Sequence, residues 1–153
     1  MTDCWNHKIF QASRWFTFLA ALLVAACGPA RVSLRVGQTI NPDIHGRPSP
    51  VVLRMYELKS LTAFNAADFF SLNDKDKEIL GPDLLVRDEF FLRPGDKQEF
   101  KRKLQDGTRY VGVIAAFRDL EHAQWRSVVA VTPGRTTTLI VRVDGQKVSV
   151  ATK

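Results

Sequence analysis

Tyr110-Val111-Gly112-Val113-Ile114-Ala115-Ala116-Phe117 is the most apolar run in the chain after residue 30. The turn signal Asp106-Gly107 comes shortly before it. A short apolar run that follows a turn signal is typical of a buried strand. We therefore expect residues 110–117 to form a central strand, with the rest of the domain arranged around it.

The segments after this run alternate between strand and turn signals. Residues 125–132 form the next expected strand, and Pro133-Gly134 ends it. Every second residue from 137 to 143 is then Thr, Leu or Val, which is the period of a half-buried strand. Asp144-Gly145 is the strongest hairpin signal in the chain, so residues 147–152 should pair with the strand before it.

The segments before the apolar run contain two more strands separated by a break. From residue 32 to 36, Val, Leu and Val alternate with Ser and Arg, which predicts a half-buried strand. Three prolines and a glycine within residues 41–50 prevent this strand from continuing. Residues 51–58 are apolar on both faces, which indicates a strand that is covered from each side.

Two strands are expected between Pro82 and the apolar run. In the first, four apolar residues share one face because they occupy alternate positions: Leu84, Val86, Phe90 and Leu92. In the second, lysines at 97, 101 and 103 line one face, while Phe100 points inward and Arg102 shares its parity. A charged outer face is typical of an edge strand that resists pairing with another chain.

The residues from 60 to 81 form the one helical stretch. Asn65 with Asp68 three residues later is a variant of the capping box, which predicts a helix that begins near residue 65. A second helix is expected over residues 74–80, started by Asn73 and stopped by Gly81-Pro82.

About eight short strands with regularly spaced turns and one helical insertion define the fold class. We predict an all-β, antiparallel β-sandwich over residues 31–153, with the helical insertion at about 60–81.

A second apolar run, from Trp15 to Ala26, lies close to the start of the chain. It is too short for a membrane-spanning helix, which needs roughly 20 residues. Lys8 and Arg14 precede it and small residues close it, as in an export signal. Val24-Ala25-Ala26-Cys27 resembles the bacterial lipobox, so we expect residues 1–26 to be a lipoprotein signal peptide and 27–30 to be a lipidated Cys27 with a short tether. An ordinary cleavage site that leaves Cys27 as a free thiol is the alternative.

Composition limits the possible partners and the possible cross-links. The whole chain carries a net charge of +6, which becomes +5 without Asp3, Lys8 and Arg14 of the expected signal. This surplus is too small to indicate nucleic acid as a partner. Cys4 would leave with the signal, so Cys27 would have no cysteine within its own chain to pair with. Arg31 and Arg35, near the expected anchor, could contact anionic lipid or could simply be solvated.

The sequence contains no recognisable reactive constellation. His45 and His122 have no Cys, His or carboxylate neighbour at ligand spacing, so we expect no metal site. The serines of the domain lie in no nucleophile-elbow context, and no glycine-rich phosphate loop is present. Asp88 and Glu89 are adjacent on a strand and should face opposite sides, which prevents paired acid–base catalysis. We therefore expect no catalytic residue, no enzyme activity, and no cofactor other than the covalent lipid on Cys27.

The loop of residues 41–50 has two interpretations. Its three prolines restrict its conformations, so a partner that binds it loses less entropy than it would with a floppy loop. The simpler interpretation is a rigid connector between the two sheets.

Taken together, these segments resemble a known family, the type VI secretion system outer-membrane lipoprotein TssJ (SciN/VasD-like). The resemblance covers almost the whole domain after Cys27, and it rests on the order and spacing of several short motifs. They are Asn41-Pro42-Asp43, Gly46-Arg47-Pro48-Ser49-Pro50, Tyr56-Glu57-Leu58-Lys59, Ala67-Asp68-Phe69-Phe70, Leu80-Gly81, Asp83-Leu84-Leu85, Pro94-Gly95, residues 112–119 and Trp125-Arg126.

The resemblance implies a transthyretin-like sandwich that faces the periplasm and is anchored by lipid in the inner leaflet of the outer membrane. It also implies a partner, the periplasmic C-terminal domain of TssM, and through it TssL and the trans-envelope complex. In this family the loop after the first strand contributes to that contact, so the expected contact residues here are Asn41, Asp43, Ile44 and Arg47.

Two other functions remain open. Sandwiches of this shape host many activities, so a periplasm-facing small-ligand carrier or hydrolase is the main alternative, and it would need a deep apolar pocket. A lipoprotein that acts on the envelope without any protein partner is the other.

Overall fold

Eight strands and two short helices make up this computed structural model, which describes residues 29–153. The expected signal peptide and Cys27 lie outside the described residues. The strands are β1 Pro29–Val36, β2 Val51–Leu58, β3 Leu84–Leu92, β4 Lys97–Lys103, β5 Tyr110–Ala115, β6 Arg126–Ala130, β7 Thr137–Asp144 and β8 Lys147–Thr152.

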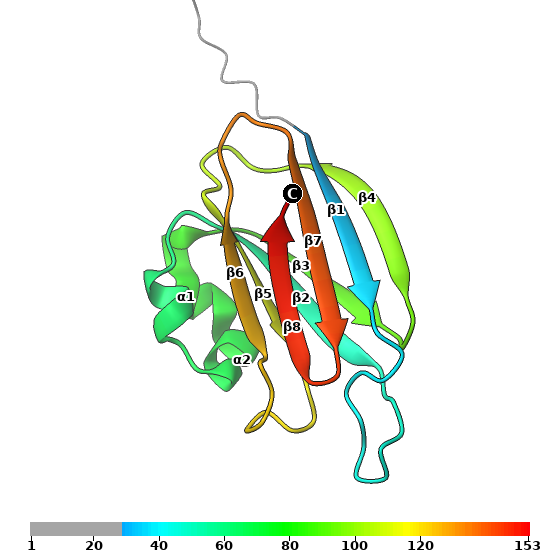
Figure 1. Cartoon of the computed structure of the whole chain (residues 1–153). Helices are drawn as coiled ribbons and strands as arrows, with labels where there is room; N and C mark the ends of the chain where they lie inside the picture. The colour runs from blue at the N-terminus through cyan, green and yellow to red at the C-terminus, as the bar shows by residue number, and fades with distance from the viewer. Residues whose placement is uncertain (1–28) are drawn as a thin grey trace, which may run out of the picture.

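The strands form two four-stranded sheets, with the orders β4-β1-β7-β8 and β3-β2-β5-β6 (Figure 1). The predicted β-sandwich is therefore confirmed. The expected positions of β5 inside one sheet and of β4 at an edge of the other are also correct. All pairs are antiparallel except β1 and β7, which run parallel. The predicted hairpin joins β7 to β8 through Gly145, whose φ of +55° is one that glycine adopts readily.

The main core lies between the two sheets. Alternate residues of each strand point inward because successive side chains of a strand face opposite sides. The innermost of them are less than 2% exposed and include Val32, Leu34, Leu53, Met55, Val111, Val113, Leu139, Val141, Val143 and Val148.

A second core lies on the outer side of sheet β3-β2-β5-β6, under helices α1 (Thr62–Ala66) and α2 (Phe69–Leu80) (Figure 1). This arrangement explains the apolar residues on both faces of β2: Leu53 and Met55 face the main core, whereas Tyr56 and Leu58 join the second one. Phe64 of α1 lies directly over Gly112 of β5, where a Cβ atom would be only 2.8 Å from the Phe64 ring. None of the described helices is both long and apolar enough to cross a membrane.

The helix starts differ from the sequence prediction. Asn65 lies inside α1, and the residue that caps a helix is Asp68, whose side chain accepts a hydrogen bond of 2.9 Å from the backbone N–H of Ser71. Asn73 does not start a helix, because α2 already runs from Phe69. The non-helical backbone at Lys75 nevertheless divides α2 into two helical segments, and the second lies within the predicted range of 74–80 and ends at Gly81 as expected. A 3₁₀ turn, η1 (Gly81–Asp83), leads from α2 into β3.

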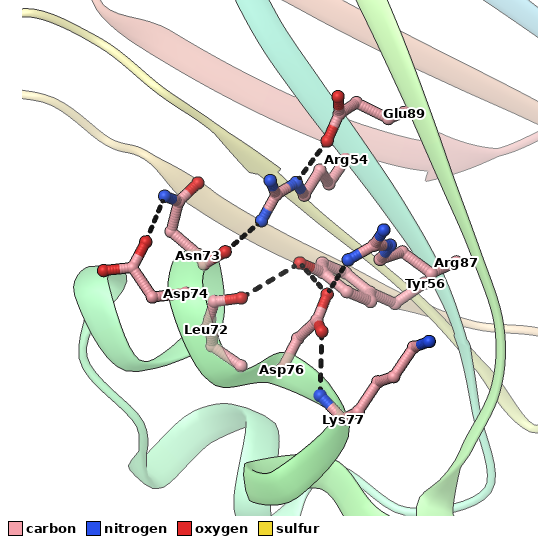
Figure 2. A network of polar contacts seen from close by, with 9 residues as sticks. All are labelled: Arg54, Tyr56, Leu72, Asn73, Asp74, Asp76, Lys77, Arg87 and Glu89. Atoms are coloured by element: carbon pink, nitrogen blue, oxygen red, sulfur yellow. Dashed lines mark hydrogen bonds and ion pairs between the residues drawn. The ribbon is translucent and has the colours of Figure 1, made fainter.

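Polar contacts fasten α2 to the sheet beneath it (Figure 2). The Tyr56 hydroxyl lies 3.4 Å from the carbonyl oxygen of Leu72 and 3.5 Å from Oδ2 of Asp76. Asp76 also forms an ion pair of 3.0 Å with Arg87 of β3. Arg54 donates hydrogen bonds to the backbone carbonyl of Asn73 and to the carboxylate of Glu89. Its Nε lies 2.7 Å from Oε2 of Glu89. Burial in this site raises the pKa of Tyr56 to about 12, with the Asp76 charge as the next cause.

Candidate functional site: the loop between β1 and β2

The loop of residues 37–50 lies at the end of the sandwich opposite to Pro29, the first described residue (Figure 1). β1 separates the two ends, and its 8 residues at about 3.3 Å each span roughly 25 Å. The turn between β7 and β8 lies beside the loop and hydrogen-bonds to it: the backbone N–H of Asn41 donates to the carbonyl of Gly145 at 2.8 Å.

The base of the loop is fixed by Asn41. Its φ of +47° is the only positive value found for a non-glycine residue in the described chain, and its side chain is almost fully buried. The amide nitrogen donates to the carbonyl of Pro50 at 2.8 Å, and the amide oxygen accepts from the backbone N–H of Arg118 at 2.8 Å. One side chain therefore joins the loop to the start of β2 and to the segment after β5. Asn is the non-glycine residue best suited to this conformation.

The tip of the loop is fixed by Asp43. Its Oδ1 accepts from the backbone N–H groups of His45 and Arg47, each at 2.9 Å, and its Oδ2 lies 2.7 Å from Nε of Arg47. Gly46 closes the turn with a φ of +76° and donates to the Asp43 carbonyl at 2.9 Å. The hydrogen bond from the Arg47 backbone is the largest cause that lowers the pKa of Asp43 below its usual 3.8.

This framework presents Ile44 to solvent. Ile44 is 95% exposed, the most exposed of the large apolar side chains in the described chain. The Arg47 side chain beside it is 75% exposed. An exposed apolar side chain on a hydrogen-bonded turn contributes nothing to the core, but it can be buried by a partner at little cost in loop entropy.

An open hollow of about 680 Å³ lies beside the tip. The loop supplies one wall and the segments after β5 and β7 supply the other; the lining residues are Pro42, Asp43, Ile44, His45, Arg47, Arg118, Asp119 and Gln146. Asp119 lies 2.9 Å from Nδ1 of His122, and this hydrogen bond is the main cause that lowers the pKa of Asp119. The hollow offers both charges and an apolar edge, which suits a polypeptide surface better than a small reacting molecule.

The four residues predicted for partner contact belong to this loop, but they are not equivalent. Asn41 is turned inward, whereas Ile44 and Arg47 point into solvent, and Asp43 shapes the turn between them. Arg118, Asp119 and Gln146 were not assigned to the site from the sequence. Only the fold brings them to residues 42–47, so no local pattern could have identified them. Cys27, the predicted lipidation site, lies outside the described residues.

The described residues contain no group of three or more His, Cys, Asp or Glu side chains that could hold a metal ion. His45 and His122, the two histidines of this region, are both exposed.

Comparisons with known proteins identify the family. A family model described as "Type VI secretion lipoprotein, VasD, EvfM, TssJ, VC_A0113" matches residues 29–146. Its description names secretion lipoproteins and no enzymatic activity. A search of curated proteins found no match.

Solved structures share both fold and sequence with the chain. The crystal structure of the T6SS lipoprotein TssJ1 from Pseudomonas aeruginosa is 39% identical, covers 82% of this chain and 96% of its own, and superposes with a TM-score of 0.79. A chain of a structure described as "Type VI membrane complex" is 28% identical, with 81% and 98% coverage and a TM-score of 0.69.

A third match is a chain of a structure described as "T6SS protein TssM C-terminal domain (869-1107) from EAEC". It is 25% identical, covers 80% of this chain and 97% of its own, and has a TM-score of 0.65. The resemblance noted in the sequence is thus confirmed, and the protein belongs to the TssJ family of type VI secretion lipoproteins.

Proposed function

We propose that this chain is acylated at Cys27 and held in the inner leaflet of the outer membrane, facing the periplasm. There it tethers and helps to assemble the type VI secretion membrane complex by binding the periplasmic C-terminal domain of TssM, and through TssM it is linked to TssL. The loop of residues 37–50 makes the contact, with Ile44 as its apolar anchor.

The observation that carries this proposal is the exposure of Ile44 on a turn that is already formed. Asn41 and Asp43 fix the base and the tip by hydrogen bonds, so binding does not have to order the loop. Full burial of an Ile side chain contributes about 1.5 to 3 kcal/mol. The membrane complex and the TssM domain named for two of the structural relatives support a partner of this class.

The position of the loop supports the tethering part of the proposal. Pro29 is two residues from Cys27, so a lipid anchor would hold that end of β1 against the membrane. The loop lies at the other end of β1, roughly 25 Å along the strand from that attachment point, so the lipid anchor itself would not cover it. Stable anchoring needs more than one acyl chain, and bacterial lipoproteins of the kind that this lipobox resembles carry three. Mass spectrometry of the mature chain tests the lipid directly, because a bare Cys27 would contradict it.

A paired substitution tests the contact. Ile44→Ser should weaken binding to the purified TssM C-terminal domain at least about tenfold, since apolar anchors near the centre of an interface typically contribute more than about 1.4 kcal/mol. Ile79→Ser is the matched control: Ile79 is also an exposed isoleucine, but it lies near the end of α2, which leads to Leu84 beside Leu58, at the end of β2 farther from the loop. Isothermal titration calorimetry measures both. Parent-like affinity for Ile44→Ser, or an equal loss for Ile79→Ser, would show that the loop is not the binding site.

The carrier or hydrolase alternative receives no support from the interior. The space between the sheets is filled by the side chains of the main core, and the hollow at the loop is open and mixed in polarity. A small-ligand site would be expected to be enclosed and mainly apolar.

A further inference from the structure

The outer side of sheet β4-β1-β7-β8 carries cations on every strand. In β1 and β7 the core residues alternate with residues that point outward. The residues of β4 and β8 that are paired with these outward-pointing residues lie on the same side of the sheet. We call this side the basic face. It contains two carboxylates, Glu99 and Asp144, and eight cations. Seven of the cations lie in the strands: Arg31, Arg35, Lys97, Lys101, Lys103, Arg142 and Lys147. The eighth, Lys153, directly follows β8, and its backbone N–H bonds to the carbonyl of Thr138 at 2.9 Å, next to the outward-pointing residues of β7.

The basic face holds the whole positive surplus of the domain. Its eight cations and two carboxylates give a charge of +6, whereas residues 29–153 together carry +5. The remainder of the domain is therefore close to neutral. A random distribution of charge would not concentrate the surplus on one of the two sheets.

The cations are also placed where they repel one another. Lys97, Arg35 and Arg142 are neighbours across three adjacent strands, and Arg31 is opposite Lys101. Like charges in directly opposite positions destabilise a sheet. Within the described residues, the ion pairs of the domain involve none of these five side chains. Folding alone does not favour this arrangement, and an external polyanion would offset the repulsion.

No described helix covers the basic face, and the face includes Pro29, the first described residue. Both helices lie on the other sheet (Figure 1). Pro29 is exposed, points outward from β1 and is paired with Lys103. Cys27 is only two residues earlier, so it lies within about 7.6 Å of Pro29 along the chain. An acyl group on Cys27 would therefore place the membrane surface at the edge of the basic face.

We propose that the basic face docks on anionic phospholipid headgroups of the membrane that holds the acyl anchor. This proposal rests on the acylation of Cys27 in the proposed function. Each Lys or Arg near an anionic membrane strengthens attachment about fivefold. The continuity of the face with the anchor favours lipid over an acidic protein surface, because the anchor keeps headgroups within reach at all times. Docking would thus fix the orientation of a domain that the anchor alone leaves free to tilt.

The test uses the full anchored protein in lipid nanodiscs. Ser149→Cys places a fluorescent donor on the basic face, and an acceptor lipid in the disc reports its proximity by energy transfer. The discs contain phosphatidylcholine alone, or phosphatidylcholine and phosphatidylglycerol in equal parts. We expect stronger transfer with phosphatidylglycerol, and we expect high salt to abolish the increase because it screens exposed charges.

Two triple variants identify the surface responsible. Arg35→Gln with Lys97→Gln and Arg142→Gln should lower the docking equilibrium on the order of 100-fold, at about fivefold for each cation. Lys59→Gln with Lys75→Gln and Lys77→Gln removes the same charge from exposed positions outside the basic face and should dock like the parent. Equal energy transfer in discs with and without phosphatidylglycerol would overturn the proposal and leave an acidic protein surface as the occupant. Equal behaviour of the two triple variants would also overturn it.

Failure of the anchor gives a different result. The parent chain without Ser149→Cys takes up no dye if Cys27 is acylated, because its other cysteine, Cys4, lies in the signal peptide. Dye uptake by the parent would contradict the proposed function itself, independently of any dependence on phosphatidylglycerol.

Discussion

Asn41 combines a left-handed backbone, at a φ of +47°, with a buried amide that bonds to two other segments. Most residues other than glycine pay about 1 kcal/mol or more for this backbone conformation. Each buried hydrogen bond contributes about 0.5 to 1.5 kcal/mol. The two bonds therefore offset the strain and fix the point from which the loop departs.

Substitutions of Asn41 separate these two effects. Asn41→Ala should lower the free energy of unfolding by about 2 to 4 kcal/mol, because it removes both bonds and leaves the backbone strained. Asn41→Gly removes the same bonds but accepts the backbone conformation, so it should be about 1 kcal/mol more stable than Asn41→Ala. Urea unfolding measures both differences. Equal stabilities of the two variants would show that the backbone conformation carries no strain.

At this scale the sequence could locate the loop but could not orient its residues. Three prolines and a glycine mark the break in the strand, and the resemblance to a family pointed to Asn41, Asp43, Ile44 and Arg47. A loop has no side-chain period, so nothing in the sequence separates the buried Asn41 from the exposed Ile44. The partners of Asn41, at Pro50 and Arg118, are set by the sheet topology.

Among the elements, α2 depends on an unusual polar contact with β2. The Tyr56 side chain is fully buried under the helix, and its hydroxyl faces the Leu72 carbonyl and the Asp76 carboxylate. Ionisation of this hydroxyl would place a second negative charge beside Asp76 in a site that water does not reach. The folded protein therefore keeps the proton more tightly than the unfolded chain does.

This contact predicts a loss of stability in alkaline solution. Tyr56 titrates near 10.0 in the unfolded chain and at about 12 in the fold, so its contribution is complete below pH 10 and is lost as the pH rises towards 12. The loss is at most about 2 to 3 kcal/mol, from 1.36 kcal/mol for each pKa unit. The Tyr56→Phe variant should be less stable than the parent at neutral pH. Between pH 10 and 11.5, however, its free energy of unfolding should fall less than that of the parent, because this range lies between the two pKa values of Tyr56. Parallel pH profiles from denaturant unfolding would contradict the assignment.

The strands themselves were largely predictable, whereas their connections were not. Alternating apolar residues marked β1, β3 and β7, continuous apolar runs marked β2 and β5, and turn signals and charge marked the others. The prediction that Leu84, Val86, Phe90 and Leu92 share one face is wrong at Leu84. The register shifts between Glu57 and Leu58, and Leu84 therefore packs with the core under the helices. The parallel pairing of β1 with β7 also left no local signal, since the two strands are about a hundred residues apart.

At the scale of the whole molecule, an ion group joins the two sheets where β4 and β3 form their edges. Arg102 of β4 points inward and pairs with Asp88 of β3, and its Nη2 lies 2.9 Å from Oε1 of Glu57. Glu57 is 1% exposed, and its other oxygen accepts from the backbone N–H of Gln105 and the hydroxyl of Thr108, each at 2.8 Å. The sequence predicted that Arg102 shares the inner face of β4 with Phe100, and its ion pairs with Asp88 and Glu57 explain this position.

A double-mutant cycle tests whether this ion group holds the sheets together. Arg102→Met should cost about 3 to 5 kcal/mol, because it leaves the buried Glu57 charge without its cation. Glu57→Gln in the same chain removes that charge and can still accept the bonds from Gln105 and Thr108, so the double variant should recover most of the loss. Guanidinium unfolding of the parent, both single variants and the double variant gives the coupling energy, which we expect to exceed about 1.5 kcal/mol. Additive losses would mean that Arg102 acts mainly through its packing or through Asp88. In that case the sandwich would be closed at this edge by apolar contacts such as the stacked rings of Phe90 and Phe100, whose centroids are 5.7 Å apart.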